Sequence, residues 1–334
     1  MAEWLPIIWG ALLGVALMLY VVLDGFDLGI GILFPWGRDE RERDVMMNSI
    51  APMWDGNETW LVLAGGGLLA AFPLAYSVMM PALYIPVILM LFALIFRGVA
   101  FEFRFKSNRS RGVWDFAFTA GSTVAAFTQG LVLGALIQGF EVEGRGFAGG
   151  PLDWLTPFAL MTGFALVCGY ALLGACWLIL KTEGELQAWA RHAAQWLIFV
   201  VLGWIALVSL FTPITHPNVA ERWFAWPNLL LLAPVPILTA AVAGALFYSL
   251  RRGAEWRPFL LTIVLFALGY GGIGISLWPY IVPWQLTFHE AAAQPESQLF
   301  LLAGALPLLP LILAYTAYNY WVFRGKTRPD AGYH

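Results

Sequence analysis

Four acidic residues lie inside apolar stretches of the sequence, in two pairs that could carry protons or ions. Asp24 and Asp27 are three residues apart, and so are Asp55 and Glu58, so each pair falls on one side of a helix. An ionised acid at the middle of a membrane helix costs roughly 2.5–3.5 kcal/mol. We therefore expect these acids to share protons, meet a countercharge or contact water, as the groups of a membrane proton relay do.

One cation, Arg97, lies within a third apolar stretch and is long enough to reach toward these acids. A single arginine cannot neutralise four carboxylates, so we expect their protonation to be coupled. In the structural alternative, Arg97 only forms a buried ion pair, and Asp24 or Asp27 only bonds a neighbouring helix. Pro52 is expected to kink the second apolar stretch just before its acids.

The elements that position these residues are membrane helices. The 334 residues are 60% hydrophobic and 12% charged, with a mean hydropathy of +0.74, whereas soluble domains are about 45–50% apolar. The small net charge of −3 does not suggest nucleic-acid binding. Nine stretches are long and apolar enough to span a bilayer, so an all-α polytopic membrane protein is predicted. These stretches are 5–34, 45–72, 76–103, 114–140, 152–180, 187–211, 226–250, 258–282 and 299–323.

The cations predict the orientation of the chain. Fifteen of the 18 Lys and Arg residues lie in the connections after odd-numbered stretches or in the C-terminal tail, while Arg145 and Arg222 lie on the other side. By the positive-inside rule the N-terminus is outside and the C-terminus is cytoplasmic. The N-terminal segment carries Glu3 where a signal peptide needs basic residues, so we expect a retained first helix.

Glycines four residues apart predict close helix packing. Gly25 and Gly29 form one such pair, and Gly130 and Gly134 form another. Small residues at this spacing let two helix backbones approach each other. Because the connections are short, neighbouring helices are expected to pack antiparallel.

The histidines are poorly placed for a haem or a metal. His216 and His289 fall in outer connections, His192 at an inner helix end, and His334 is the last residue. A membrane cytochrome usually places axial ligands within its helices. No metal cluster, phosphate-binding loop or nucleophile triad is evident, so we expect no redox centre and no catalytic residue in this chain alone.

Several long motifs resemble one protein family. They are "DGFDLGIG" (24–31), "NSIAPMWDGNETWLVLAGG" (48–66), "FRGVAFEFRFK" (96–106), "SLWPYIVPW" (276–284) and "EAAAQPESQ" (290–298). The sequence resembles subunit II of the cytochrome bd-type quinol oxidases along its whole length. The last two motifs lean toward the cyanide-insensitive branch of that family.

The resemblance implies a haem-free subunit of a bacterial inner-membrane oxidase that oxidises quinol and reduces dioxygen to water. It implies a pseudosymmetric partner, subunit I, which holds two b-type haems, haem d (or a third b-type haem) and the quinol site, and a small single-helix accessory subunit. The implied fold is one integral-membrane domain, 1–334. Residues 1–145 and 146–283 would form two four-helix bundles, and 284–334 a peripheral ninth helix and cytoplasmic tail.

The resemblance also implies roles for particular residues. The family's proton route from the cytoplasm is thought to use the aspartate of the Trp-Asp-Gly-Asn motif, here Asp55 between Trp54 and Asn57. Glu102 and Lys106 match residues near the inner surface, and Arg97 matches a family arginine. Some relatives have Gln at the position of Glu58 and Asp at that of Glu102. The alternatives are a purely structural subunit and a stand-alone transporter or ion carrier with a mid-membrane acidic site.

Overall fold

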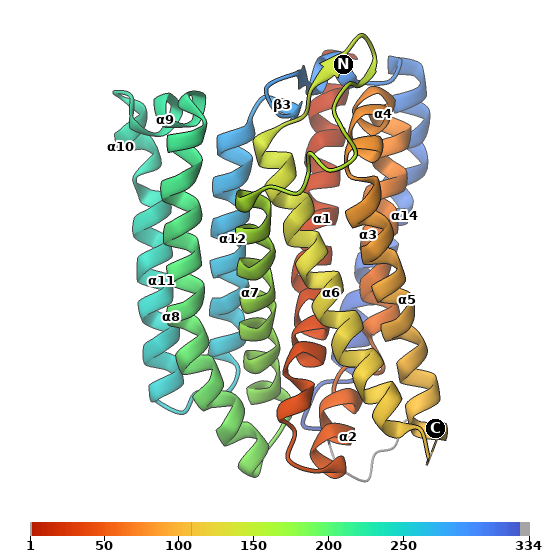
Figure 1. Ribbon diagram of the computed structural model, residues 1–334, viewed down its shortest axis with the longest axis vertical. Coiled ribbons are helices and arrows are strands. Elements are labelled where there is room, and N and C mark those ends of the chain that lie inside the picture. The colour runs from red at the N-terminus through yellow and green to blue at the C-terminus, as the bar shows by residue number, and fades with distance from the viewer. Residues whose placement is uncertain (1, 108, 328–334) are drawn as a thin grey trace.

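The computed structural model describes residues 2–107 and 109–327 and is built almost entirely from helices (Figure 1). Nine long helices run side by side: α1 (Leu5–Leu33), α3 (Trp54–Ala71), α5 (Tyr84–Lys106), α6 (Arg111–Gln138), α7 (Pro157–Lys181), α8 (Gly184–Thr215), α11 (Pro234–Arg251), α12 (Arg257–Leu277) and α14 (Pro295–Val322). Within the described ranges, eight segments are long and apolar enough to cross a membrane. Of the long helices, only α3 is not among them, because its first turns are polar.

Short elements connect the long helices at the two ends of the molecule. The short helices are η1 (Ala2–Trp4), η2 (Phe34–Trp36), α2 (Glu40–Asn48), α4 (Pro73–Ala82), α9 (Pro217–Phe224), α10 (Asn228–Leu232) and α13 (Phe288–Ala291). Two antiparallel hairpins pair β1 (Val142–Glu143) with β2 (Gly146–Phe147), and β3 (Tyr280–Val282) with β4 (Leu286–Thr287). The hairpins, α9, α10 and α4 lie at one end, and α2 lies at the opposite end (Figure 1).

The expected second stretch, 45–72, is not one continuous helix. Helix α2 ends at Asn48, a turn follows, and α3 begins at Trp54. Pro52 lies in that turn and has no N–H to continue a helix. Its carbonyl accepts a hydrogen bond from Asn319 Nδ2 of α14 at 3.3 Å, so the expected kink is a full break that a distant helix stabilises.

Glycines let α1 and α7 approach each other closely in the core. A Cβ atom on Gly29 would lie 1.9 Å from the carbonyl oxygen of Tyr170, and one on Gly174 would lie 2.5 Å from the carbonyl carbon of Gly29. A Cβ atom on Gly130 would similarly lie 2.5 Å from the carbonyl oxygen of Thr162. The predicted close packing at Gly29 and Gly130 is therefore confirmed.

The helices are unequally buried. Helix α1 packs against α3, α6 and α7 and forms much of the core, whereas α14 contacts mainly α1 and α3 and exposes large apolar side chains, among them Leu306, Leu311 and Tyr315. Helices α8 and α11 lie at one lateral edge, and α5 and α14 lie at the other (Figure 1). The two lateral edges are thus available to different neighbours.

Candidate functional site

Arg97 of α5 is fully buried and brings three of the predicted acids together. Its Nη1 atom lies 2.8 Å from Asp24 Oδ1 and 2.7 Å from Glu58 Oε1, and its Nη2 atom lies 3.8 Å from Asp27 Oδ2. Asp24 and Asp27 have no exposed surface, and the Glu58 side chain is 24% exposed. One guanidinium thus faces three carboxylates where α1, α3 and α5 meet.

Asn57 links this charge cluster to the last helix. Its Nδ2 atom donates to Asp27 Oδ2 at 2.7 Å and to the carbonyl of Leu23 at 3.2 Å. The hydroxyl of Tyr320 in α14 donates to Asn57 Oδ1 at 3.0 Å. The amide therefore holds α1, α3 and α14 in register. Tyr320 is 263 residues away in sequence, and sequence reasoning missed it.

Trp54 covers another side of the arginine. Its ring stacks on that of Phe101, with centroids 4.8 Å apart and planes within 1°. The guanidinium carbon of Arg97 lies 5.9 Å from each ring centroid, a distance at which cation–π attraction operates. The role expected for Trp54, supporting the motif, agrees with this position.

Asp55 lies apart from the other three acids. Its side chain is exposed, while Glu58 one turn later reaches Arg97. Residues three apart on a helix differ by roughly 60° in direction, so the sequence-based expectation of one shared face holds only loosely. Asp55 therefore presents a carboxylate on the outer surface of this chain, beside the buried cluster.

Glu102 and Lys106 form an ion pair at the end of α5, with Lys106 Nζ 3.0 Å from Glu102 Oε2. Both side chains are exposed, at 55% and 77% respectively. They lie beyond Arg97 along the helix, toward the end that carries α2 (Figure 1). Neither residue contacts the Arg97 cluster in the described part of the chain.

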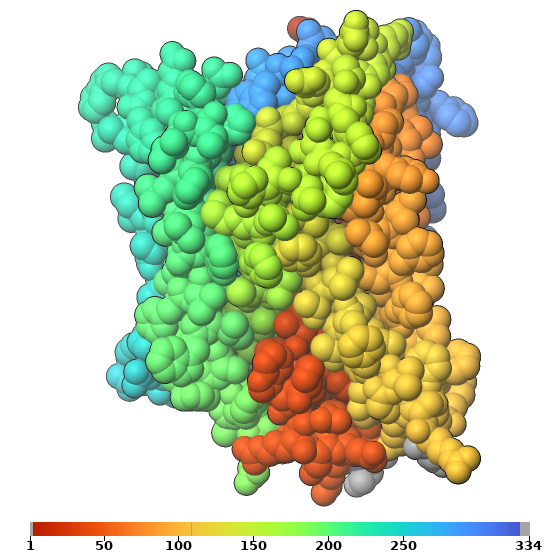
Figure 2. Space-filling view, in the orientation of Figure 1, coloured from red at the N-terminus to blue at the C-terminus, as the bar shows by residue number. Residues whose placement is uncertain are grey.

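A second buried arginine lies two turns after the first and was missed as a site residue. Arg104 forms ion pairs with Asp44 and with Asp115, the latter at 2.5 Å from Nε to Oδ1. Arg43 also reaches Asp115, at 3.3 Å. The count of cations in the sequence placed Arg104 among the residues of the cytoplasmic connections. Its spacing of seven residues from Arg97, however, indicates that both arginines lie on the same face of the helix. These ion pairs fasten α2 to α5 and α6. The red-orange segment at the lower end of Figure 2, which includes α2, lies at the molecular surface.

A chain of hydrogen-bonded side chains extends from α1 to α7. Gln129 Nε2 donates to the hydroxyl of Tyr20 at 2.7 Å, and the hydroxyl of Tyr170 donates to Gln129 Oε1 at 2.8 Å. Tyr20 and Tyr170 are buried, and Tyr20 lies one turn before Asp24 on α1. Polar contacts therefore continue from the Arg97 cluster toward α7.

The histidines lie apart from one another. His216 stacks on Trp284 with ring centroids 5.3 Å apart, and burial lowers the pKa of His216. His192 accepts a hydrogen bond from Trp196, His289 is exposed in α13, and His334 lies outside the described residues. Within 2–107 and 109–327, no three His, Cys, Asp or Glu side chains are grouped so as to hold a metal ion.

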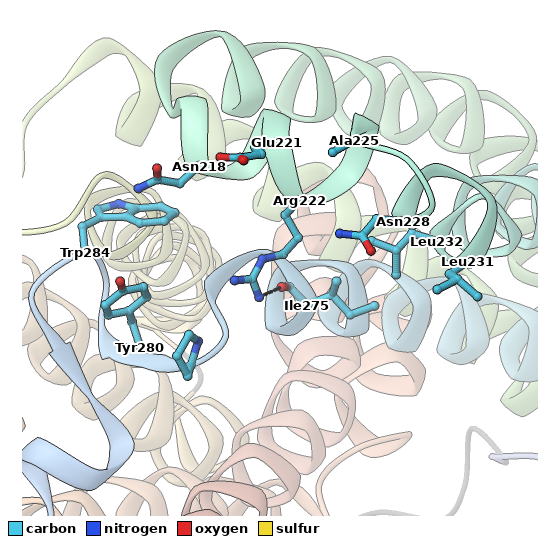
Figure 3. A pocket seen from close by; sticks show the side chains of 11 residues that line it. Asn218, Glu221, Arg222, Ala225, Asn228, Leu231, Leu232, Ile275, Tyr280 and Trp284 are labelled. Carbon is cyan, nitrogen blue, oxygen red and sulfur yellow. Dashed lines mark hydrogen bonds between the residues drawn. The ribbon is translucent and has the colours of Figure 1, made fainter.

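A pocket of about 660 Å³ opens beside α9 and α10, at the end of the molecule that carries the hairpins (Figure 3). Its lining includes Glu221, Arg222, Tyr280 and Trp284. Arg222 donates from Nη1 to the carbonyl of Ile275 at 3.1 Å, which ties α9 to α12. None of the acids predicted for the site lines this pocket.

These features define a multi-pass α-helical membrane protein that encloses a cluster of acids around one arginine. A family model described as cytochrome bd terminal oxidase subunit II matches residues 5–323. The chain is 31% identical to cytochrome bd-I ubiquinol oxidase subunit 2 of Escherichia coli strain K12, over 98% of this chain and 97% of that one. It is 30% identical to cytochrome bd ubiquinol oxidase subunit 2 of Bacillus subtilis strain 168, over 96% of each chain.

The fold is similar to that of the bd oxidase from Geobacillus thermodenitrificans, with a TM-score of 0.78 and 16% identity over 96% of this chain and 98% of that chain. The chain therefore belongs to the cytochrome bd terminal oxidase subunit II family. Its place is in a respiratory oxidoreductase complex of the membrane, as the sequence motifs indicated.

Proposed function

We propose that this chain is the haem-free subunit that supports a haem-bearing subunit I and conducts protons from the cytoplasm toward it through Asp55. The observation that carries the proposal is the exposed carboxylate of Asp55 next to the buried Arg97 cluster. An ionisable carboxylate on the outer surface of a membrane helix is unfavourable in lipid, so it must contact a partner subunit or water. A partner subunit on this face supplies the cover.

The face around Asp55 suits close contact with another set of helices. Gly65 and Gly66 of α3 have open space where a Cβ atom would lie, so a partner backbone can approach there. Large apolar side chains are exposed on two of the helices that hold the Arg97 cluster, including Val62 of α3 and Phe92 and Phe96 of α5. We assign this face to the pseudosymmetric subunit I, which would hold the two b-type haems and haem d or a third b-type haem. Quinol and dioxygen would bind in that subunit, and a single-helix accessory subunit would complete the complex.

The proton path begins at the inner end of α5. Glu102 and Lys106 are exposed there and can exchange protons with the cytoplasm. Arg97 lies five residues further into the membrane, roughly 7.5 Å along the axis, and Glu58 contacts it. Asp55 lies one turn from Glu58 and faces outward. If all three carboxylates around Arg97 were ionised, the cluster would carry a net charge of −2, so a proton held or passed there reduces an unfavourable charge.

The topology follows from the same placement. We propose that α3, together with the turn and α2 that precede it, is the ninth membrane span, since α3 packs along α1 within the bundle (Figure 1). The N-terminus is then outside and the C-terminus cytoplasmic, in the inner membrane of a bacterium, as the distribution of cations favours. Residues 1–145 and 146–283 would form the two four-helix bundles, with 284–334 as the peripheral helix and tail.

Replacing Asp55 with Asn in the assembled complex tests the proton path. Because Asn has the same size as Asp and keeps a polar side chain at this position, the change should leave assembly and haem content intact. Quinol oxidase turnover should fall about tenfold or more, since a positioned proton donor or acceptor typically contributes about 10²–10⁴-fold to a rate. Glu221→Gln is the matched control, because Glu221 lies at the opposite end and should leave turnover unchanged. Full turnover of Asp55→Asn across the pH range would remove Asp55 from the path.

A further inference from the structure

A second, smaller pocket lies at the end of the molecule that carries the cation-rich connections. It has a volume of about 380 Å³ and lies between the last turn of α11 and the first turns of α12. Arg252, Arg257, Tyr248 and Ser249 contribute to its lining. This connection is at the lower left of Figure 1, at the lateral edge away from α5 and α14. The pocket therefore lies at the cation-rich end of the molecule, at the lateral edge far from α5.

The charges of this pocket are all of one sign. Arg252 and Arg257 line it, and neither forms an ion pair with any residue in the described ranges. The nearest acid in sequence, Glu255, is instead paired with Lys326 Nζ at 2.9 Å. The guanidinium of Arg252 lies 5.0 Å from the ring of Tyr248, and that of Arg257 lies 5.6 Å from the ring of Trp256. Two cations beside exposed aromatic rings are typical of the headgroup region of a membrane.

Arg257 does not stabilise the helix that it begins. It is the first residue of α12, and a cation there opposes the partial positive charge of a helix N-terminus. The N-cap residue, Trp256, provides no side-chain hydrogen bond to the first N–H groups. An anion bound at this position would satisfy both Arg257 and the uncapped N–H groups.

Ser249 supplies the independent observation. The residue is part of the pocket lining but is only 6% exposed, and its hydroxyl oxygen, which has almost no accessible surface, has no hydrogen-bond partner among the described residues. Its carbonyl is already used by the turn: Ala254 N–H donates to it at 3.2 Å, and Gly253 adopts a φ of +75°. This helix C-cap motif forms the turn between Arg252, which caps α11, and Arg257, which begins α12, and both arginines line the pocket. Arg191 fixes the turn further by donating to the carbonyl of Ala254 at 2.8 Å.

We propose that this pocket binds the headgroup of an anionic phospholipid. Arg252 and Arg257 would contact the phosphate, and the Ser249 hydroxyl would donate to a phosphate or glycerol oxygen. The acyl chains would lie along the exposed apolar surface of α11 and α12, where Leu260 is 48% exposed. A basic pocket between helices on the cation-rich side of a membrane protein suits such lipids. The proposal does not depend on proton conduction through Asp55.

The test measures lipid binding to the chain purified with its accompanying subunits and stripped of lipid in detergent. Native mass spectrometry follows the binding of phosphatidylglycerol, phosphatidylcholine and free glycerol phosphate. Three variants are compared with the unchanged protein: R252Q/R257Q, R109Q/R251Q and S249A. The second pair removes the same charge from the same side of the molecule, but neither Arg109 nor Arg251 lines the pocket.

Phosphatidylglycerol should bind more tightly than phosphatidylcholine. In R252Q/R257Q the affinity for phosphatidylglycerol should fall roughly fivefold for each arginine removed. R109Q/R251Q should retain it. Ser249→Ala should weaken lipid binding several-fold without lowering the thermal unfolding temperature, because the hydroxyl has no partner to lose in the protein. Equal loss of binding in the two double variants would overturn the proposal. Binding of glycerol phosphate as tight as that of phosphatidylglycerol would assign the pocket to free phosphate esters and would also overturn it.

Discussion

The two buried arginines of α5 occupy the same helix face but have different partners. Arg97 contacts three carboxylates, two of them without exposed surface. Arg104 contacts Asp44 and Asp115, and a second cation, Arg43, also contacts Asp115, so this network of two cations and two acids is balanced in charge. The acids around Arg104 also keep some exposure, 28% for the Asp44 side chain and 17% for that of Asp115.

We propose that this difference separates charge with a structural role from charge that can exchange protons. A network with equal numbers of cations and acids is neutral without binding a proton. Partial exposure also lets water solvate the charged atoms that have no partner within the network. The Arg97 cluster has more acids than cations, and two of its three acids, Asp24 and Asp27, have no exposed surface, so protons are the remaining means of lowering its charge. We therefore interpret Arg104 as a fastening point for α2 and Arg97 as the centre of the proton-exchanging cluster.

Removing Arg97 should have the largest effect. Arg97→Met leaves three acids without a countercharge in the core, a change that costs about 3–5 kcal/mol when one partner of a buried ion pair is lost. The yield of assembled complex and its haem absorbance should fall severely. Lys106→Met, which removes an exposed cation from the same helix, is the control and should assemble normally.

A second substitution sharpens this prediction. If uncompensated charge causes the loss, adding Asp24→Asn to Arg97→Met should recover part of the yield, since it removes one of the stranded acids. A double variant that assembles worse than Arg97→Met alone would show that shape, rather than charge, makes Arg97 necessary.

Arg104→Met should cost less, about 1–3 kcal/mol, because Asp44 and Asp115 can be hydrated and Arg43 remains beside Asp115. The complex should assemble with its haems, and its thermal unfolding temperature should drop by a few degrees. Turnover per assembled complex should be unchanged. A turnover defect as deep as that of Asp55→Asn would contradict the structural interpretation of this arginine.

Tyr320→Phe should have a smaller effect on the Arg97 cluster. The change removes the hydrogen bond to Asn57 Oδ1 and costs about 0.5–1.5 kcal/mol. Thermal unfolding of the complex measures the loss. Tyr318→Phe is the matched control, because that side chain is 61% exposed on the same helix. Equal shifts for the two variants would mean that the contact between α14 and Asn57 adds nothing to stability.

The sequence predicted the chemistry of the site better than its geometry. Charged residues in apolar stretches are conspicuous, so the association of Arg97 with Asp24 and Glu58 could be anticipated, as could a helix disruption at Pro52. Arg104 was missed because it lies near a helix end, where a cation is usually exposed. The exposure of Asp55 depends on how α3 is rotated about its axis, and only packing against α1 and α5 decides that rotation.

The smallest effect is expected for the exposed ion pair of Glu255 with Lys326. Hydrogen bonding to Lys326 lowers the pKa of Glu255 below its ordinary value. A lowered folded-state pKa adds stability above the unfolded-state pKa of about 4.3, and this stability is lost as pH falls through the folded-state value. Because the pair is exposed, Lys326→Met should lower the unfolding temperature at neutral pH by about 1 °C or less. The variant and the unchanged protein should converge once the pH falls below the folded-state pKa of Glu255. A difference that persisted there would show that Lys326 acts instead through the hydrogen bonds that its Nζ atom donates to the carbonyls of Ile179 and Thr182.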